Sequence, residues 1–304
     1  MGSERGICYF NHHTKHLARL AFSLWSLRTI AKHTGPVAIL DSGHSGGIVD
    51  AIASDERLNA SVIPIEVDQR RRNTAYVAKA GLWKSSPFGT TLFLDADTLA
   101  VRDPSPLFEL CEDPVSGGLV VTRFANWETT GEIVRGRIER WRGVNVKADD
   151  GTYSKSISAA DLVRRSLDAP HAAINTGVVA WTVRAFAFLN DWERLTRCGA
   201  HLPFTDELAA QLLIRKHRHT LTSDRFNCSP IYGREKGEAV IWHAHGSKHL
   251  ERPDGRGGLG DAIWRPVVLD AWRANAGGIR GWAPAGDEVL AANMPSIRNQ
   301  KIAS

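Results

Sequence analysis

Short apolar runs alternate with amphipathic stretches over the first quarter of the chain. The apolar runs at 6–10, 37–40 and 61–67 have the length expected of strands. Between them, apolar residues recur at helical spacing over 17–31, and 48–52 is also predicted to be helical. Strands that alternate with helices in this way are typical of a parallel, doubly wound α/β sheet. Ligands bind such sheets at the carboxyl ends of the strands.

A further predicted strand ends in two aspartates. The apolar run 91–94 is followed by Asp95, Ala96 and Asp97. Two carboxylates one residue apart on an extended chain point the same way, and they are costly at this spacing unless a cation neutralises them. Magnesium and manganese are commonly held by one or two carboxylates plus substrate phosphates. Together with the small Ala96 and the turn at 102–104, the motif favours a metal-bridged diphosphate.

The Asp-x-Asp motif has two other interpretations. A bare Asp-x-Asp after a strand is more often a turn and helix-capping device, because Asp is a preferred turn residue. Haloacid-dehalogenase-type phosphatases carry Asp-x-Asp-x-Thr after a strand. Here the threonine, Thr98, follows the second acid directly, and Leu99 stands where that family has Thr or Val. The fit to those phosphatases is poor.

Polar residues also interrupt a strand predicted over 172–181. Asn175, Thr176 and Gly177 stand in its middle. A glycine there lets backbone approach a ligand closely, and an Asn amide can both donate to and accept from sugar hydroxyls. From the residues alone, a bulge in the strand is the safer interpretation.

The segment from Thr205 carries two adjacent acids, Asp206 and Glu207, at the start of a helix predicted over 206–214. Thr205 is a good N-cap, and acids favour the first turn of a helix. That capping role is sufficient by itself. A glutamate here could also act as a nucleophile or stabilise oxocarbenium charge.

A last predicted strand, beginning at Val240, ends in His243 and is followed by His245, Gly246 and Lys248. A lone histidine would be interpreted as structural. Two of them beside a Gly-x-Lys, after an earlier Asp-x-Asp, favour a metal and phosphate site.

These segments resemble glycosyltransferase family 8, the group that holds glycogenin and bacterial lipooligosaccharide galactosyltransferases. The resemblance rests on 7–27, on 38–43, on 93–101 with the Pro-x-Pro-Leu-Phe turn that follows, and on the motifs at 175–177 and 243–248. It implies a GT-A fold, a Rossmann-like and mostly parallel sheet flanked by helices. It also implies a UDP-linked nucleotide-sugar donor, Mn²⁺ or Mg²⁺ on the Asp-x-Asp, and hexose transfer to an acceptor hydroxyl with retention of configuration.

The resemblance also implies roles for individual residues. Lys79 stands near the position of a family arginine, and Glu207 departs from the family's Asp-Gln pair, which leaves the retaining mechanism open. The Gly246-to-Lys248 spacing is one residue short, which makes His245 a competitor for the metal. The implied sets are Asp95, Asp97 and His243 for the metal; Asn11, Thr14, Lys79, Asp95, Ala96, Asp97, Gly177, Gly246 and Lys248 for the donor; and Asn175, Asp206 and Glu207 for catalysis.

Composition adds limits to this interpretation. The chain has 304 residues, 43% of them hydrophobic and 23% charged, which are values of a globular protein with a substantial core. No apolar run reaches the ~18 residues needed to span a bilayer, and no signal peptide is evident. The four cysteines are scattered without a Cys-x-x-Cys pair. We therefore expect a cytoplasmic protein with reduced, mostly buried thiols.

We expect a catalytic domain over 1–250, with an excursion at about 124–171 that recognises the acceptor, and a C-terminal extension over 251–304. Arginines at 135, 137, 140 and 142 favour an anionic acceptor. The acceptor itself stays open among a glycan, a protein, a metabolite and a modified base in DNA. With a net charge of +5, the alternatives are a basic nucleic-acid-associated protein and a nucleotidyltransferase, although no Gly-rich phosphate loop follows the first strand.

Overall fold

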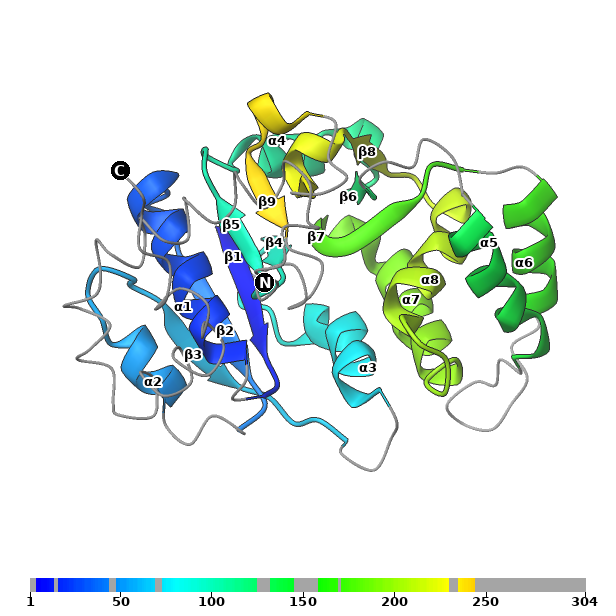
Figure 1. Cartoon of the computed structure of the whole chain (residues 1–304), viewed down its shortest axis with the longest axis horizontal. Helices are drawn as coiled ribbons and strands as arrows, with labels where there is room; N and C mark the ends of the chain where they lie inside the picture. The colour runs from blue at the N-terminus through cyan, green and yellow to red at the C-terminus, as the bar shows by residue number, and fades with distance from the viewer. Residues whose placement is uncertain are drawn as a thin grey trace, which may run out of the picture. The chain divides into compact units, whose positions relative to one another are not determined.

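A seven-stranded mixed sheet is the main element of the computed structural model (Figure 1). The structure describes residues 4–13, 16–43, 48–68, 73–124, 132–144, 158–168, 171–229 and 235–243. The strand order is β3-β2-β1-β4-β7-β6-β8. β1 and β2, β2 and β3, and β6 and β8 pair in parallel, whereas β6 and β7 are antiparallel. The strands are β1 (Arg5–Asn11), β2 (Val37–Asp41), β3 (Ser61–Pro64), β4 (Thr90–Leu94), β6 (Leu119–Arg123), β7 (Ile174–Thr182) and β8 (Thr220–Thr222).

The chain divides into two compact units, each of which is described by itself. Unit 1 comprises 1–6, 65–93 and 106–223, and unit 2 comprises 7–64, 94–105 and 224–304. Both units are therefore built from segments that are distant in the sequence.

Unit 2 contains a small antiparallel ribbon beside a helix. β5 (Thr98–Ala100) pairs with β9 (Ile241–His243), and Thr98 lies opposite His243. α1 (Leu17–Trp25) continues into a π-helical turn over 26–30 and packs against β5, while α2 (Ile48–Ala53) packs against α1. The Ala100 amide donates to Ser26 Oγ at 3.0 Å, so polar groups on the helical segment fix the ribbon.

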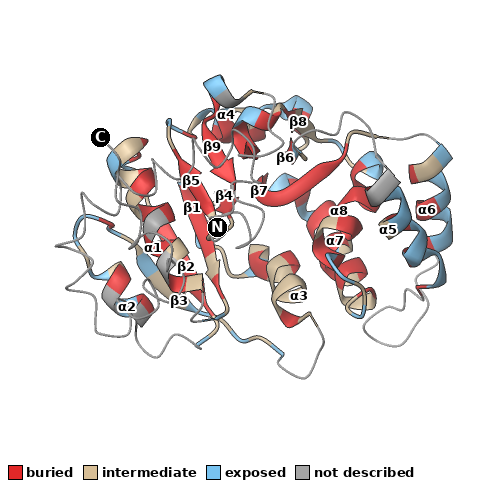
Figure 2. Ribbon diagram, viewed as in Figure 1, coloured by how far each residue is buried: buried red, intermediate tan, exposed pale blue. Residues whose placement is uncertain are grey.

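Unit 1 packs helices against β6 and β7. α8 (Thr205–Leu213) contacts β7, α7 (Phe186–Cys198) and α3 (Thr74–Gly81), and α4 (Pro106–Glu112) contacts both β6 and β7. Two further helices, α5 (Glu132–Glu139) and α6 (Ala159–Asp168), also contact α8. The strands and the inner helix faces are buried, whereas α5 and α6 present exposed faces (Figure 2).

The fold class predicted from the sequence is confirmed. The predicted helix at 17–31 and the strands at 6–10, 37–40, 91–94 and 172–181 match observed elements to within two residues. β3 is shorter than predicted, because it ends at Pro64, which has no amide hydrogen for a further ladder bond. The predicted extension at 251–304 lies outside the described residues, so the domain boundaries stay a prediction.

Three further expectations concern the cysteines, membrane-spanning helices and the arginine-rich segment. Cys8, Cys111 and Cys228 are buried free thiols and Cys198 is half-buried, as expected. No helix in the described part of the chain is long and apolar enough to cross a membrane. The four-arginine segment at 135–142 is described, and it falls on α5 and the turn that follows.

We predict that Gly118→Ala lowers the free energy of unfolding by about 2–4 kcal/mol, from left-handed strain and overpacking. Gly118 has φ +81°, and a Cβ added there would clash with Thr182 Oγ1. The matched control is Gly136→Ala on α5, where an added Cβ meets nothing within 4 Å. Gly136→Ala should leave the free energy of unfolding unchanged or raise it by up to ~1 kcal/mol. Urea denaturation measures both, and equal stability of Gly118→Ala and the unchanged protein would contradict the packing described.

Candidate functional site

A tight turn connects β4 to β5 and carries both aspartates of the Asp-x-Asp motif. The Asp95 carbonyl accepts from the Thr98 amide at 3.2 Å and from the Thr98 hydroxyl at 2.8 Å. Thr98 is also fixed from the helix side, since its hydroxyl lies 3.0 Å from Ser23 Oγ. The turn explains why Asp95 and Asp97 are side by side, with the small Ala96 between them.

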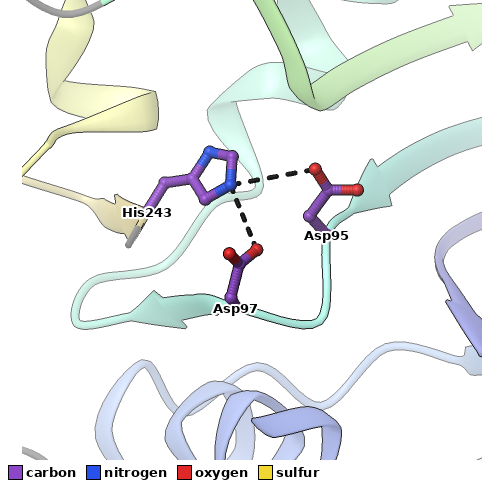
Figure 3. Close-up of side chains that lie close together, drawn as sticks. All are labelled: Asp95, Asp97 and His243. Atoms are coloured by element: carbon purple, nitrogen blue, oxygen red, sulfur yellow. Dashed lines mark hydrogen bonds and ion pairs between the residues drawn. The ribbon is translucent and has the colours of Figure 1, made fainter. Parts of the chain in front are cut away.

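His243 reaches these aspartates because of the β5–β9 ribbon. Its Nε2 atom lies 3.1 Å from Asp97 Oδ1 and 3.8 Å from Asp95 Oδ2 (Figure 3). One ligand atom from each of the three side chains lies within 4.8 Å of the others. The structure thus brings together the three residues that the sequence nominated as metal ligands, although they are up to 148 positions apart (243 − 95).

Asn227 sets the orientation of the imidazole. His243 Nδ1 donates to Asn227 Oδ1 at 2.7 Å, and the His243 side chain is buried. A neutral imidazole with its proton on Nδ1 would present the Nε2 lone pair to a cation. In the structure, Nε2 faces the two carboxylates and lies within hydrogen-bond distance of Asp97 Oδ1. The Cys228 amide donates to the Ile241 carbonyl and the His243 amide to the Cys228 carbonyl, so backbone pairing holds Asn227 beside the histidine.

This donor set fits a divalent cation. Two carboxylates within 4.8 Å of one another repel on the order of 3 kcal/mol at an effective dielectric constant of about 20. Hard oxygen ligands with one neutral imidazole suit manganese or magnesium. The amide that orients the imidazole is the kind of outer partner that metal-binding histidines commonly have. Asp95, Asp97 and His243 could therefore hold such an ion.

The ends of β1 and β2 in unit 2 carry a second polar pair. Asn11 is buried, and its amide donates to Asp41 Oδ1 at 2.7 Å. Asp41 Oδ2 also accepts from the Gly43 amide at 3.1 Å. His12 Nδ1 lies 3.2 Å from Ser42 Oγ. Asn11 thus holds the loop after β2, while Thr14, its predicted companion at the nucleoside, lies outside the described residues.

A bulge in β7 positions the Asn-Thr-Gly motif in unit 1. Val121 of β6 pairs with Val179, but the next residue, Thr122, pairs with Asn175. The register between β6 and β7 therefore skips three residues of β7, 176–178, whereas a regular ladder would skip none. Asn175 Oδ1 accepts from the Gly177 amide at 2.8 Å, which closes a local turn within the strand. The bulge was one of the two interpretations of this motif, and it is confirmed.

Two acids at the start of α8 face that bulge. Thr176 Oγ1 donates to Asp206 Oδ2 at 2.8 Å, and Asn175 Nδ2 donates to Glu207 Oε2 at 2.7 Å. Lys79 Nζ, on α3, lies 3.5 Å from Asp206 Oδ2 with its side chain 10% exposed. The three predicted catalytic residues, Asn175, Asp206 and Glu207, thus lie together in one cluster of unit 1.

The predicted N-cap of α8 is wrong. Thr205 is the first helical residue, and its hydroxyl donates to the Thr196 carbonyl at 3.1 Å instead of capping the helix. Phe204 occupies the cap position with φ 53° and makes no side-chain cap bond. A left-handed conformation is uncommon for a bulky residue. Tertiary contact with α7 has therefore overridden the local preference of threonine.

Glu207 has an unusual protonation equilibrium. Burial, with the neighbouring Asp206 as the second cause, raises the pKa of the Glu207 carboxyl from 4.5 to about 7. The positive charges of Lys79 and Arg137 and the hydrogen bond from Asn175 oppose this rise. At neutral pH the carboxyl can therefore either donate or accept a hydrogen bond, which is a property suited to proton transfer.

Some predicted site residues lie outside the described residues, and some residues of the observed clusters were not predicted. His245, the predicted competitor of His243, lies outside the described residues, as do Gly246 and Lys248. Asn227 was not predicted, because no spacing pattern connects it to His243. Asp41 lies in the segment 38–43 that carries the family resemblance, but no role was predicted for it. The signal that could have identified it is a polar residue directly after a predicted strand.

Comparison with known proteins supports the fold. No protein-family model matches the sequence, and no curated protein matches it. The structure is similar to the galactosyltransferase LgtC in complex with donor and acceptor sugar analogues, with a TM-score of 0.54 and 15% identity over 88% of this chain and 99% of that one. It is also similar to the bifunctional glycosyltransferase WbbM, with a TM-score of 0.59 and 12% identity over 97% of this chain and 52% of that one.

A third similar structure is the glycosyltransferase GlyE of Streptococcus pneumoniae, with a TM-score of 0.52 and 12% identity over 90% of this chain and 64% of that one. This chain spans about half of WbbM and about two thirds of GlyE. At these identities the likeness shows the fold, which is the GT-A fold predicted from the sequence.

We predict that Glu207 makes stability pH-dependent. Because the folded pKa is about 7, above the ordinary value, the stabilising contribution is complete below pH ~4.5 and is lost as pH rises through ~7. Relative to Glu207→Gln, the protein should lose about 2 kcal/mol between pH 5 and pH 8, after a discount for solvent screening. Urea denaturation across this range measures it. Exposed Glu56→Gln is the control, and a constant difference between the protein and Glu207→Gln would contradict the assignment.

Proposed function

We propose that this chain is a metal-dependent glycosyltransferase that moves a hexose from a UDP-linked donor to an acceptor hydroxyl with retention of configuration. The observation that carries the proposal is the convergence of Asp95, Asp97 and His243 in a GT-A fold. The donor nucleotide and the stereochemistry rest on the resemblance of the sequence motifs to glycosyltransferase family 8.

The first cluster would hold the cation and, through it, the donor diphosphate. A bound Mn²⁺ or Mg²⁺ ion would withdraw negative charge from the departing nucleoside diphosphate. Asp95 and Asp97 supply carboxylate oxygens, and His243 supplies the Nε2 lone pair that Asn227 orients. By the resemblance, Gly246 and Lys248 would serve the same diphosphate. Asn11 and Thr14 would serve the nucleoside, with Asn11 acting through Asp41.

The second cluster would bind the donor sugar. Asn175 and Asp206 present an amide and a carboxylate, which pair with sugar hydroxyls as donor and acceptor. Lys79 lies beside Asp206, with Nζ 3.5 Å from Oδ2, and would offset the negative charge of that carboxylate. Glu207, whose pKa is raised to about 7, can hold a proton or release it at neutral pH. We propose that Glu207 stabilises positive charge at the anomeric carbon in its ionised form.

Two alternatives are kept as outcomes of the test. A nucleotidyltransferase would use the same kind of metal and diphosphate site. A basic nucleic-acid-associated protein would bind DNA or RNA without needing a nucleotide sugar.

We predict that Mn²⁺ and UDP together raise the melting temperature by several degrees, and that either one alone raises it less, because only the ternary complex satisfies both the carboxylates and the diphosphate. Asp97→Asn should abolish the joint effect. Asn227→Ala should weaken Mn²⁺ binding by about 10–100-fold, because it removes the group that orients the imidazole. A thermal-shift titration with UDP, GDP and their sugars measures these effects.

The matched control is Asp103→Asn, an exposed aspartate on the same segment whose replacement keeps an acceptor for the Ser105 amide. It should bind Mn²⁺ and UDP as the unchanged protein does. Hydrolysis of the donor sugar, measured in the same samples, distinguishes a glycosyltransferase from a nucleotidyltransferase. Tight DNA binding with no joint effect of metal and nucleotide would refute the proposal.

A further inference from the structure

Arg137, on α5, is held in an unusual environment. Its guanidinium carbon lies 4.3 Å from the centroid of the Phe204 ring, and the residue is half-buried. Among the residues that the structure describes, no hydrogen bond or ion pair to Arg137 is found. A guanidinium has five N–H donors in its plane, and stacking on a ring occupies its face but not those donors.

The other arginines of this segment differ. Arg142 pairs with Glu139, with Nε 2.9 Å from Oε2, and Arg135 and Arg140 are exposed. Solvent can satisfy an exposed guanidinium completely. A half-buried one that contacts an aromatic ring has given up part of its hydration, and this is costly unless a hydrogen-bond acceptor replaces the water. Arg137 is therefore the arginine in this segment best placed to bind a ligand.

The ring beneath Arg137 is placed by strained backbone. Phe204 has φ 53°, and its side chain is 42% exposed. Asn73 donates through its amide to the Ala200 carbonyl at 2.9 Å and to the Leu202 carbonyl at 2.8 Å, which ties down the loop before Phe204. The Tyr76 ring lies 6.4 Å from the Phe204 ring. Two aromatic rings thus lie near each other, and one of them belongs to the residue two positions before Asp206 on α8.

Neutralising those acids is not a sufficient role for Arg137. Asp206 already has Lys79 at 3.5 Å and the Thr176 hydroxyl at 2.8 Å, and Glu207 accepts from Asn175 at 2.7 Å. Arg137 makes no ion pair with either carboxylate, although its charge lowers the pKa of Glu207. Among the described residues, nothing occupies its N–H donors beside the cluster.

We propose that Arg137 and Phe204 form a subsite for an acceptor sugar that carries an oxyanion, either a carboxylate or a phosphate. The edge of the guanidinium would bind the oxyanion through paired N–H donors, and the exposed part of the Phe204 ring would pack on the apolar face of the sugar. The assignment of this ligand to the acceptor rests on the proposed function. The chemistry of the subsite itself rests on the geometry of unit 1.

The test is a calorimetric titration with three probes: glucose, glucuronate and glucose 6-phosphate. The unchanged protein should bind at least one of the two acids about 10-fold or more tightly than glucose, which is the range of a hydrogen bond to a charged group. Arg137→Ala should reduce that preference to less than threefold, and Arg137→Lys should retain only part of it, because lysine lacks the planar fork. The preferred acid tells carboxylate from phosphate.

Arg135→Ala, an exposed arginine two residues away, is the matched control and should keep the full preference. Phe204→Leu keeps the charge and removes the ring, so it should weaken all three sugars together. Circular dichroism confirms that each variant is folded. Equal binding of the acids and glucose to the unchanged protein, no binding of any probe, or an equal loss in Arg135→Ala would overturn the proposal.

The same samples are titrated with Mn²⁺ and UDP, so that the two proposals fail separately. If the nucleotide binds with metal but the preference for acids is absent, the oxyanion subsite is refuted and the transferase stands. If the preference is present but the nucleotide does not bind, the subsite is supported and its assignment to a glycosyl acceptor is refuted.

Discussion

The account of this protein depends on the convergence of two carboxylates and one imidazole nitrogen on a single point. One ligand atom each of Asp95, Asp97 and His243 lies within 4.8 Å of the others, and His243 Nε2 faces both carboxylates. Such a group of atoms is stable where a cation joins it. The turn after β4, the β5–β9 ribbon and the Asn227 amide all place these atoms.

The charges of the second cluster, around Asp206 and Glu207, are balanced in a different way. In unit 1, Asp206 has a lysine beside it and a threonine hydroxyl bound to it, and Glu207 responds to its burial by a raised pKa of about 7 instead of by ion pairing. Its acids are therefore balanced by protein groups and protons, whereas the first cluster suits an external cation. A site that must bind sugar hydroxyls and exchange protons needs the former kind of balance, and a diphosphate site needs the latter.

The sequence predicted those parts of the structure that are encoded locally. The Asp-x-Asp motif stood out because an apolar strand precedes it, and the strands and the longer helices followed from periodicity. Three short elements were missed because they carry too little pattern: β5 and β8 have three residues each, and α4 has seven. The helices α5 and α6 were also missed, because they lie in a mostly polar segment that was assigned only as an excursion. The residues alone favoured a metal and phosphate site near His243, and the family resemblance implied that His243 shares one ion with Asp95 and Asp97. The roles of Asn227 and Arg137 depend on tertiary contacts between distant segments, as does the Thr205 hydroxyl that bonds Thr196 instead of capping α8.

The most direct test is pulsed electron paramagnetic resonance of Mn²⁺ bound to the protein, with and without UDP. The account predicts nitrogen coupling from one imidazole, which disappears in His243→Ala, and phosphorus coupling that appears when UDP is added. Nitrogen coupling that persists in His243→Ala would show that another residue binds the ion. A spectrum of fully hydrated Mn²⁺ in the presence of the unchanged protein and UDP would contradict the central claim.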